Sequence, residues 1–331
     1  MKRDERPSAP PTPIADAAAA SVPVLYVGGC QRSGSTLLDR IMSQVPGHVS
    51  AGEVVHLWVR GLSADELCGC GEPFHDCPFW SEVGRVGFGG WENLPSEAVV
   101  ELQKRVDRNR YIPFMLFPWL SRRYQRDLTR YTSLLERLYR SIAAVGGGVV
   151  VDSSKHASTA FLLRRVPSVQ VLVIHLIRDS RGVTFSLSKR VPRPEVVEGD
   201  AFMHRAAPWR SAVEWMAFNG LFHMLRMTGT PILRARYEEL VLDPVRIVRA
   251  VLTAEARPGD AADLDFIEGS TISLDVDHTV AGNPMRFEHG RFPLRLDEAW
   301  RGSMATRDRR TTTLMTWPLL AAYGYLRRGH R

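Results

Sequence analysis

The stretch Gly29–Thr36 (GCQRSGST) decides the fold class of this chain. The apolar run Val22 to Val27 precedes it and predicts a buried strand, and apolar residues at helical spacing follow it from Leu37 to Met42. A strand, a glycine-containing loop and a helix form an anion site, because loop N–H groups and the positive end of the helix dipole converge there. We therefore predict an α/β fold of the P-loop-NTPase type, with three layers around a central parallel sheet and with helical insertions.

The loop departs from the pattern of an ATP or GTP site. A Walker loop places a lysine directly after its second glycine. Here Ser35 stands at that position, and the cation is Arg32, which precedes Gly34. The missing lysine argues against an ordinary nucleoside triphosphate site. The alternative of a plain strand-to-helix turn, with glycines for close packing, stays open at this point.

The loop resembles the 5′-phosphosulfate loop of sulfotransferases, in the form found in carbohydrate and tyrosyl-protein sulfotransferases and in many bacterial members. These enzymes transfer a sulfuryl group from 3′-phosphoadenosine-5′-phosphosulfate (PAPS) to a hydroxyl or an amine. The resemblance implies that the loop binds this co-substrate through Arg32, Ser33, Gly34, Ser35 and Thr36. It further implies that Arg32 stabilises charge during the transfer.

A second anion site is predicted where the run Val169 to Ile177 ends. This run is almost unbroken and rich in β-branched residues, which is typical of a central parallel strand. Arg178 follows directly, at the strand end where ligands bind in such sheets, and Ser186 lies two helical turns further on. The resemblance implies that Arg178 and Ser186 hold the 3′-phosphate of PAPS. A structural salt bridge between Arg178 and Asp179 is the alternative.

Lys155 and Glu53 are the remaining candidate catalytic residues. Lys155 ends the short apolar strand that begins at Val149, and sulfotransferases place such a lysine against the moving group. Glu53 follows Gly52, a context similar to that of the base glutamate in tyrosyl-protein sulfotransferases. A solvated loop lysine and a surface-turn glutamate are the alternatives. His56 competes with Glu53 as the base.

Two further segments resemble parts of the cofactor site of sulfotransferases. Pro231 to Tyr237 predicts a fourth strand, and the resemblance places Tyr237 near the nucleotide, with core packing as its alternative. The segment His278–Phe287 (HTVAGNPMRF) resembles one in bacterial sulfotransferases. It predicts a loop that closes over the cofactor through Asn283 and Arg286.

Composition agrees with this assignment. The chain has 331 residues, 44% of them hydrophobic, and a formal net charge of +7. We expect a disordered tail over 1–21 and a single domain over 22–331 with a helical insertion at about 90–146. We expect no membrane span and no secretory signal, and hence a cytoplasmic protein. The basic residues are spread along the chain, which argues against a nucleic-acid partner.

The cysteines leave three interpretations open. Cys68, Cys70 and Cys77, with His75 among them, bring three thiols and an imidazole into ten residues. A zinc site, a disulfide and buried free thiols are all compatible with this spacing. Because sulfuryl transfer needs no metal, we assign no metal ligand to the reaction.

The sequence therefore predicts a PAPS-dependent sulfotransferase that acts on a small-molecule, glycan or lipid acceptor, with adenosine 3′,5′-bisphosphate as the second product. The alternatives are a nucleotide-dependent phosphotransferase and a non-catalytic protein that binds PAPS or another nucleotide. The segments 191–205 and 207–227 are where we expect acceptor contacts.

Overall fold

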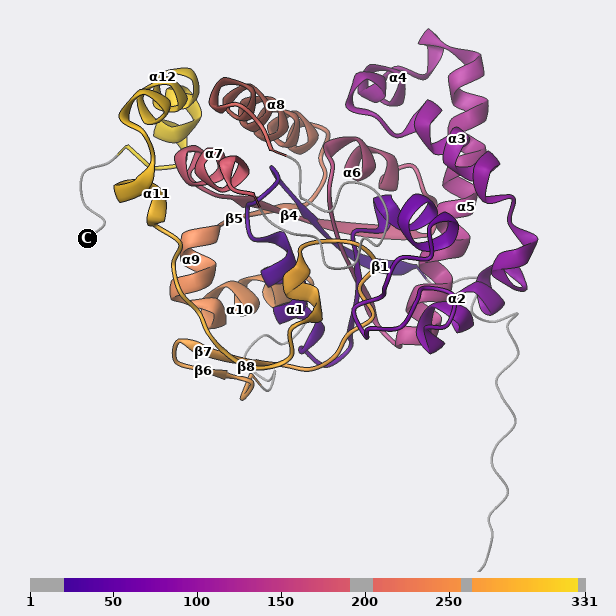
Figure 1. Cartoon of the computed structure of the whole chain (residues 1–331). Coiled ribbons are helices and arrows are strands. Elements are labelled where there is room, and N and C mark those ends of the chain that lie inside the picture. Colours follow the sequence, from indigo (N-terminus) through magenta and orange to yellow (C-terminus); the bar gives the residue numbers. More distant parts are fainter. Residues whose placement is uncertain (1–20, 191–204, 257–263, 327–331) are drawn as a thin grey trace, which may run out of the picture.

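The structure, a computed structural model, describes residues 21–190, 205–256 and 264–326 (Figure 1). Most of the predicted N-terminal tail, and the predicted acceptor segment 191–205 apart from Arg205, lie outside these ranges.

A parallel sheet of five strands forms the centre of the molecule, in the order β2-β3-β1-β4-β5. The strands are β1 Val22–Gly28, β2 His48–Gly52, β3 Val149–Lys155, β4 Val169–Ile177 and β5 Ile232–Arg236. The four predicted strands are present, and β2 is an additional strand at the sheet edge. The predicted α/β class with a central parallel sheet is confirmed.

Helices cover both faces of the sheet, because the side chains of each strand alternate between them (Figure 1). On β1, Val24 and Tyr26 pack in one buried cluster, while Leu25 and Val27 pack in another. The first cluster includes α5 Arg122–Gly146, α6 Ala157–Leu163 and α8 Pro208–Met227. The second includes α1 Ser35–Ser43, α9 Tyr237–Leu242 and α10 Pro244–Ala254. Each fully buried aliphatic side chain contributes about 1.5–3 kcal/mol to folding.

All the regular elements between β2 and β3 are helices. They start at Val54, and the buried aromatic rings of Trp58 and Trp80 join these helices to the same core. The elements are η2 Val54–His56, the π-helix η3 Leu57–Ser63, α2 Pro78–Phe88, η4 Trp91–Asn93, α3 Ser96–Val106, η5 Asn109–Tyr111, α4 Ile112–Leu116, η6 Pro118–Leu120 and α5.

The described residues also form a small antiparallel sheet and three further helices. The sheet has the order β6-β7-β8, formed by Ile267–Glu268, Thr271–Leu274 and Gly290–Pro293, and η7 Pro284–Phe287 precedes β8. The helices are α7 Ser180–Ser188, which follows β4, and then α11 Ala299–Ser303 and α12 Thr306–Ala322. Among the described helices, none combines the length and apolar character that a membrane crossing requires.

Candidate active site

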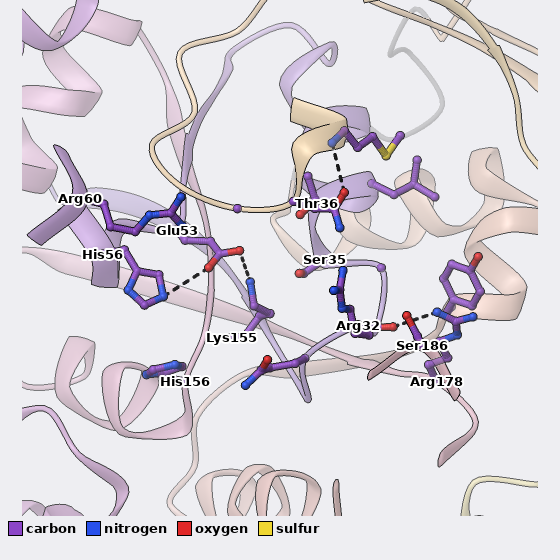
Figure 2. Close-up of a pocket in the computed structure, with 17 residues that line it drawn as sticks. Arg32, Ser35, Thr36, Glu53, His56, Arg60, Lys155, His156, Arg178 and Ser186 are labelled. Carbon is purple, nitrogen blue, oxygen red and sulfur yellow. Dashed lines mark hydrogen bonds and ion pairs between the residues drawn. The ribbon is translucent and has the colours of Figure 1, made fainter. Parts of the chain in front are cut away.

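A cavity of about 540 Å³ opens at the carboxyl edge of the parallel sheet (Figure 2). This volume is within the range of small-molecule sites. The cavity lies where the loops after β1, β2, β3 and β4 meet, which is where parallel sheets place their ligands. The residues that line it are Gln31, Arg32, Gly34, Ser35, Thr36, Leu37, Glu53, His56, Arg60, Lys155, His156, Arg178, Ser186, Tyr237, Gly282, Asn283 and Met285.

The loop after β1 presents the start of α1 to this cavity. Gly34 precedes the helix with φ 93°, and no side chain caps the first turn. The free N–H groups of that turn can therefore bind an anion. The neighbouring hydroxyl of Ser33 is buried and has no hydrogen-bond partner among the described residues. Ser33 does not line the cavity, whereas Ser35 and Thr36 do.

Arg32 supplies positive charge at the same place. Its pKa is lowered, first by burial and then by the nearby guanidinium of Arg178. Two guanidinium groups held close together favour a bound anion, because the anion offsets their mutual repulsion. Arg32 also has φ 63°, a left-handed conformation that costs a non-glycine residue free energy and that is concentrated at functional sites.

Arg178 is buried at the end of β4 and is held from three sides. It donates one hydrogen bond to the carbonyl of Arg32 at 3.1 Å and another to Oδ2 of Asp297 at 2.9 Å. Its guanidinium also stacks over the ring of Tyr237, 4.4 Å from the centroid. Ser186, on α7, lines the cavity beside it (Figure 2).

Asp179 does not form the salt bridge with Arg178 that was the structural alternative. Its carboxylate pairs with Arg181 at 2.5 Å and accepts the backbone N–H of that residue at the start of α7. Asp179 therefore acts as a helix cap. This arrangement leaves Arg178 facing the cavity, with Asp297 as its carboxylate partner.

Glu53 lies between Lys155 and His56 (Figure 2). One carboxylate oxygen accepts a hydrogen bond from Nζ of Lys155, and the other lies 3.5 Å from Nε2 of His56. The backbone fixes this geometry, because the N–H of Glu53 donates to the carbonyl of Val280 at 2.8 Å. The N–H of Val55 also donates to the hydroxyl of Ser154 at 2.9 Å, which joins η2 to the end of β3.

Both candidate bases are deprotonated at neutral pH. Burial is the largest single influence on Glu53 and would raise its pKa, but the charge and hydrogen bond of Lys155, together with His56 and Arg60, outweigh burial and the pKa is lowered. Burial lowers the pKa of His56 to about 4, against the opposing attraction of Glu53. The geometry thus offers an ionised carboxylate and a neutral imidazole side by side.

Lys155 is half-buried and adopts φ 70°. It is the second lining residue, after Arg32, to occupy the left-handed region without being a glycine. Such strain persists only where the surrounding structure imposes it. Here the ion pair with Glu53 and the end of β3 hold Lys155 in place, and its ammonium group faces the same cavity as the loop after β1 (Figure 2).

The segment 278–287 forms one wall of the cavity through Gly282, Asn283 and Met285. The side-chain oxygen of Asn283 accepts the N–H of Met285 at 3.1 Å. Arg286, which we expected to contact the cofactor, is buried next to the lining residue Met285 and does not itself line the cavity. Its guanidinium donates to the carbonyl of Thr279 at 2.9 Å, so it stabilises the shape of the loop.

Several lining residues had no place in the sequence-based prediction. Gln31 and His156 adjoin predicted residues, so their position beside Arg32 and Lys155 was a usable signal. Arg60 lies on η3, four positions after His56, and carried no such signal. Asp297 does not line the cavity, but it pairs with Arg178 from a segment more than a hundred positions away, which no local pattern indicated.

The cysteines lie outside the cavity lining. His75, the imidazole expected among them, is exposed, and its Nε2 lies 3.1 Å from the carbonyl of Leu62 instead. His278 takes its place beside the thiols of Cys68 and Cys77.

No model of a known protein family matches the chain, and no curated relative does. Among solved structures, similar chains include the sulfotransferase domain of the Synechococcus PCC 7002 olefin synthase, with 18% identity, a TM-score of 0.44 and coverage of 91% of this chain and 95% of that one. The sulfotransferase domain of the curacin biosynthetic pathway has 17% identity, a TM-score of 0.44 and coverage of 90% and 99%. Sulfotransferase STF9 from Mycobacterium avium has 16% identity, a TM-score of 0.42 and coverage of 74% and 67%. Likenesses this distant do not assign a reaction, which has to be inferred from the site.

Proposed function

We propose that this chain is a PAPS-dependent sulfotransferase that transfers a sulfuryl group to a hydroxyl or an amine of an acceptor. The observation that carries the proposal is the composition of the cavity. It combines a phosphate-binding loop that lacks the Walker lysine, a separate guanidinium and hydroxyl from Arg178 and Ser186, and the Glu53–Lys155 pair. PAPS has anionic groups at both ends of its ribose, which these two anion sites suit.

In the proposed reaction the acceptor oxygen attacks sulfur in line, and the bond from sulfur to the 5′-phosphate oxygen breaks. The start of α1 and Arg32 bind the 5′-phosphosulfate, while Arg178 and Ser186 bind the 3′-phosphate. Lys155 and Arg32 stabilise the negative charge on the sulfuryl oxygens and on the leaving phosphate. Glu53 accepts the proton of the acceptor hydroxyl, and adenosine 3′,5′-bisphosphate leaves.

The charge pattern of the cavity disfavours a phosphotransferase. Such enzymes bind nucleotide phosphates together with Mg²⁺, which is held by carboxylates. Glu53 is the single carboxylate among the residues that line the cavity in the described part of the chain, and Lys155 neutralises it. The ionised Glu53 also distinguishes the site from one that only binds a nucleotide, since binding requires no base.

Thermal shift tests the proposal without knowledge of the acceptor. Adenosine 3′,5′-bisphosphate should raise Tm, and ATP with Mg²⁺ should do little, because ATP lacks the 3′-phosphate. Arg178→Ala should weaken binding of the bisphosphate about tenfold to a hundredfold. Arg85→Ala, which removes an exposed arginine paired with Glu82, is the matched control and should not change it. Equal stabilisation by ATP that depends on Mg²⁺ would overturn the proposal.

The acceptor can then be identified with radiolabelled PAPS. The protein is incubated with the labelled co-substrate and a cell extract, and the labelled product is isolated and characterised. A small molecule, a glycan, a lipid or a protein tyrosine would each give a distinct product. Transfer of label to any of them, abolished by Arg178→Ala at low PAPS concentration, supports the assignment.

A further inference from the structure

A second group of reactive side chains lies outside the cavity lining. The sulfur atoms of Cys68, Cys70 and Cys77 and a ring nitrogen of His278 all lie within 4.8 Å of one another. Three of these groups come from one short segment, while His278 comes from more than two hundred positions further along the chain. Folding therefore brings together a donor set that the local sequence does not contain.

The separations match a tetrahedron around one ion. With zinc bonds of about 2.3 Å to sulfur and about 2.0–2.1 Å to nitrogen, a regular tetrahedron has edges of about 3.8 Å between sulfurs and about 3.6 Å between sulfur and nitrogen. The observed Cys70–Cys77 distance is 3.7 Å between sulfurs. Nδ1 of His278 lies 3.3 Å from the sulfur of Cys77 and 4.0 Å from that of Cys68.

The same distances exclude a disulfide in this structure. A disulfide requires sulfur atoms about 2.05 Å apart, far less than the Cys70–Cys77 separation. All four cysteines of the chain are unpaired, including Cys30, which is buried in a different cluster. Thiols are weak hydrogen-bond donors, so hydrogen bonding alone gives little reason for three of them to meet an imidazole.

The surrounding structure holds the donors in place. The ring of His278 stacks on Phe79 with centroids 5.1 Å apart, and its carbonyl accepts from Nε1 of Trp80 at 2.8 Å. The N–H of Gly69 donates to the carbonyl of Thr279 at 3.0 Å. Gly69 also has no room for a side chain, because a Cβ would lie 2.5 Å from the hydroxyl oxygen of Thr279. These contacts orient the ligands before any ion binds, as outer groups do in metal sites.

We propose that Cys68, Cys70, Cys77 and His278 bind one Zn²⁺ in a structural site. Three thiolates and one imidazole in tetrahedral arrangement are a ligand set typical of zinc. All four positions come from the protein, so none is left for a reacting water or substrate, as is usual in structural sites. The three thiols lose their protons when the ion binds, and the site carries a net charge of about −1.

The zinc site would stabilise the position of the segment 278–287, which forms one wall of the cavity. His278 lies two positions before Val280, whose carbonyl accepts the N–H of Glu53. The same segment continues to Gly282 and Asn283, which line the cavity. Binding an ion to both His278 and the cysteine segment would therefore hold this wall against the helical region. The inference does not depend on the proposed function, since it concerns the ion and the fold.

The first test measures metal in the full-length protein, purified under reducing conditions without chelators. We expect about one zinc per chain by elemental mass spectrometry. Replacing zinc with Co²⁺ should produce the intense visible and near-ultraviolet absorption of tetrahedral cobalt bound to thiolates. Removing the metal should lower Tm, and any loss of activity should follow the loss of folded protein rather than precede it.

Matched variants locate the ion. His278→Asn and Cys77→Ser should reduce bound zinc to a small fraction of the wild-type content. His75→Asn makes the same change at an imidazole that lies near the cysteines in sequence but outside the cluster, and it should leave bound zinc unchanged. Cys30→Ala should likewise leave it unchanged, since Cys30 lies elsewhere.

Two outcomes would overturn the proposal. One is a reduced wild-type protein that contains no zinc and gives no thiolate–cobalt absorption on titration with Co²⁺. The other is a disulfide between Cys70 and Cys77, detected by non-reducing peptide mapping of freshly purified protein. Because these readouts use the wild-type protein and need no activity, they stand even if the variants fold poorly. They also stand whether or not the chain transfers sulfuryl groups.

Discussion

At the scale of single residues, Glu53 and His56 are two candidate bases, one a carboxylate and the other an imidazole. Both can accept a proton at neutral pH, since the pKa of each is lowered, that of His56 to about 4. A pH–rate profile of the free enzyme would therefore be flat down to about pH 5 for either base. Substitution, rather than pH, has to separate them.

Glu53→Gln keeps the size of the side chain and removes the base. We expect turnover to fall about a hundredfold or more, while affinity for adenosine 3′,5′-bisphosphate changes little. His56→Asn, the matched control, should reduce turnover less, because His56 supports Glu53 at 3.5 Å without taking the proton. Steady-state kinetics and calorimetry with the bisphosphate provide the two readouts. Full turnover in Glu53→Gln, together with a large loss in His56→Asn, would make His56 the base.

At the scale of elements, the contact between the loop after β1 and α9 shapes the proposed nucleotide site. Gly34 adopts φ 93°, and a Cβ at this position would lie 2.6 Å from the ring of Tyr237. Tyr237 in turn stacks on Arg178. The loop, the tyrosine and the arginine therefore form one packed unit, and displacement of one member displaces the others.

Gly34→Ala tests this unit. The left-handed backbone costs a non-glycine residue about 1–2 kcal/mol, and the clash should also push Tyr237 away from Arg178. We expect a lower Tm and about tenfold weaker binding of adenosine 3′,5′-bisphosphate. Gly290→Ala has a similar φ of 95° with open space around the new Cβ, so it should lower Tm without weakening binding. Equal nucleotide affinity in both variants would contradict the packed unit.

A second element-scale feature is the anchoring of the segment 275–288 by α1. Arg40 is fully buried and pairs with Asp277 at 3.1 Å. It also donates to the carbonyls of Asp275 and Met285, each at 2.8 Å. The helix α1, which follows the loop after β1, thus also holds the segment that forms one wall of the cavity. Removing one partner of such a buried pair typically lowers the free energy of unfolding by about 3–5 kcal/mol. Arg40 therefore has a structural role and needs no ligand contact to account for its position.

At the scale of the whole molecule, one buried histidine links the sheet to the helical layer. Nε2 of His175, a residue of β4, lies 2.8 Å from the side-chain oxygen of Asn219 on α8. The ring of His175 also stacks on Phe222. Burial lowers its pKa from 6.5 to about 3, although the hydrogen bond to Asn219 opposes this shift. The folded protein therefore keeps His175 neutral where the unfolded chain would protonate it.

The stability that neutral His175 contributes should be lost as pH falls. Since its pKa is lower in the folded state, the contribution is complete above pH 6.5 and decreases between pH 6.5 and about 3. His175→Gln keeps a donor toward Asn219 and does not titrate. Relative to this variant, the wild type should lose about 1 kcal/mol of unfolding free energy between about pH 7 and pH 5.5.

Urea denaturation at the two pH values provides the measurement. Comparing the two proteins cancels the contributions of other groups, such as Asp152, whose pKa is raised to about 6 by burial. A difference between wild type and His175→Gln that does not change with pH would contradict the expectation.

Local sequence patterns determined the fold class and most of the residues that meet at the cavity. The strand Val169–Ile177 was predicted with the bounds that β4 has, because a long β-branched run is typical of a central parallel strand, and its second half, from Val173 to Ile177, is buried. Polar residues at the ends of such strands lie close together, because parallel strands share one carboxyl edge. Their convergence can therefore be predicted from the strand pattern. Arg32, Lys155 and Arg178 therefore reached one cavity as the sequence indicated.

Tertiary structure alone decided the partners of those residues. The pairing of Arg178 with Asp297 and the meeting of His278 with the cysteines join segments separated by more than a hundred positions. The short strands β2, β6, β7 and β8 likewise left no clear period in the sequence, since two to five residues are too few to show one. Contacts of this kind depend on how whole elements pack, and no local pattern records that packing. For this reason the sequence pointed to His75 as the imidazole beside the thiols, and the fold places His278 there.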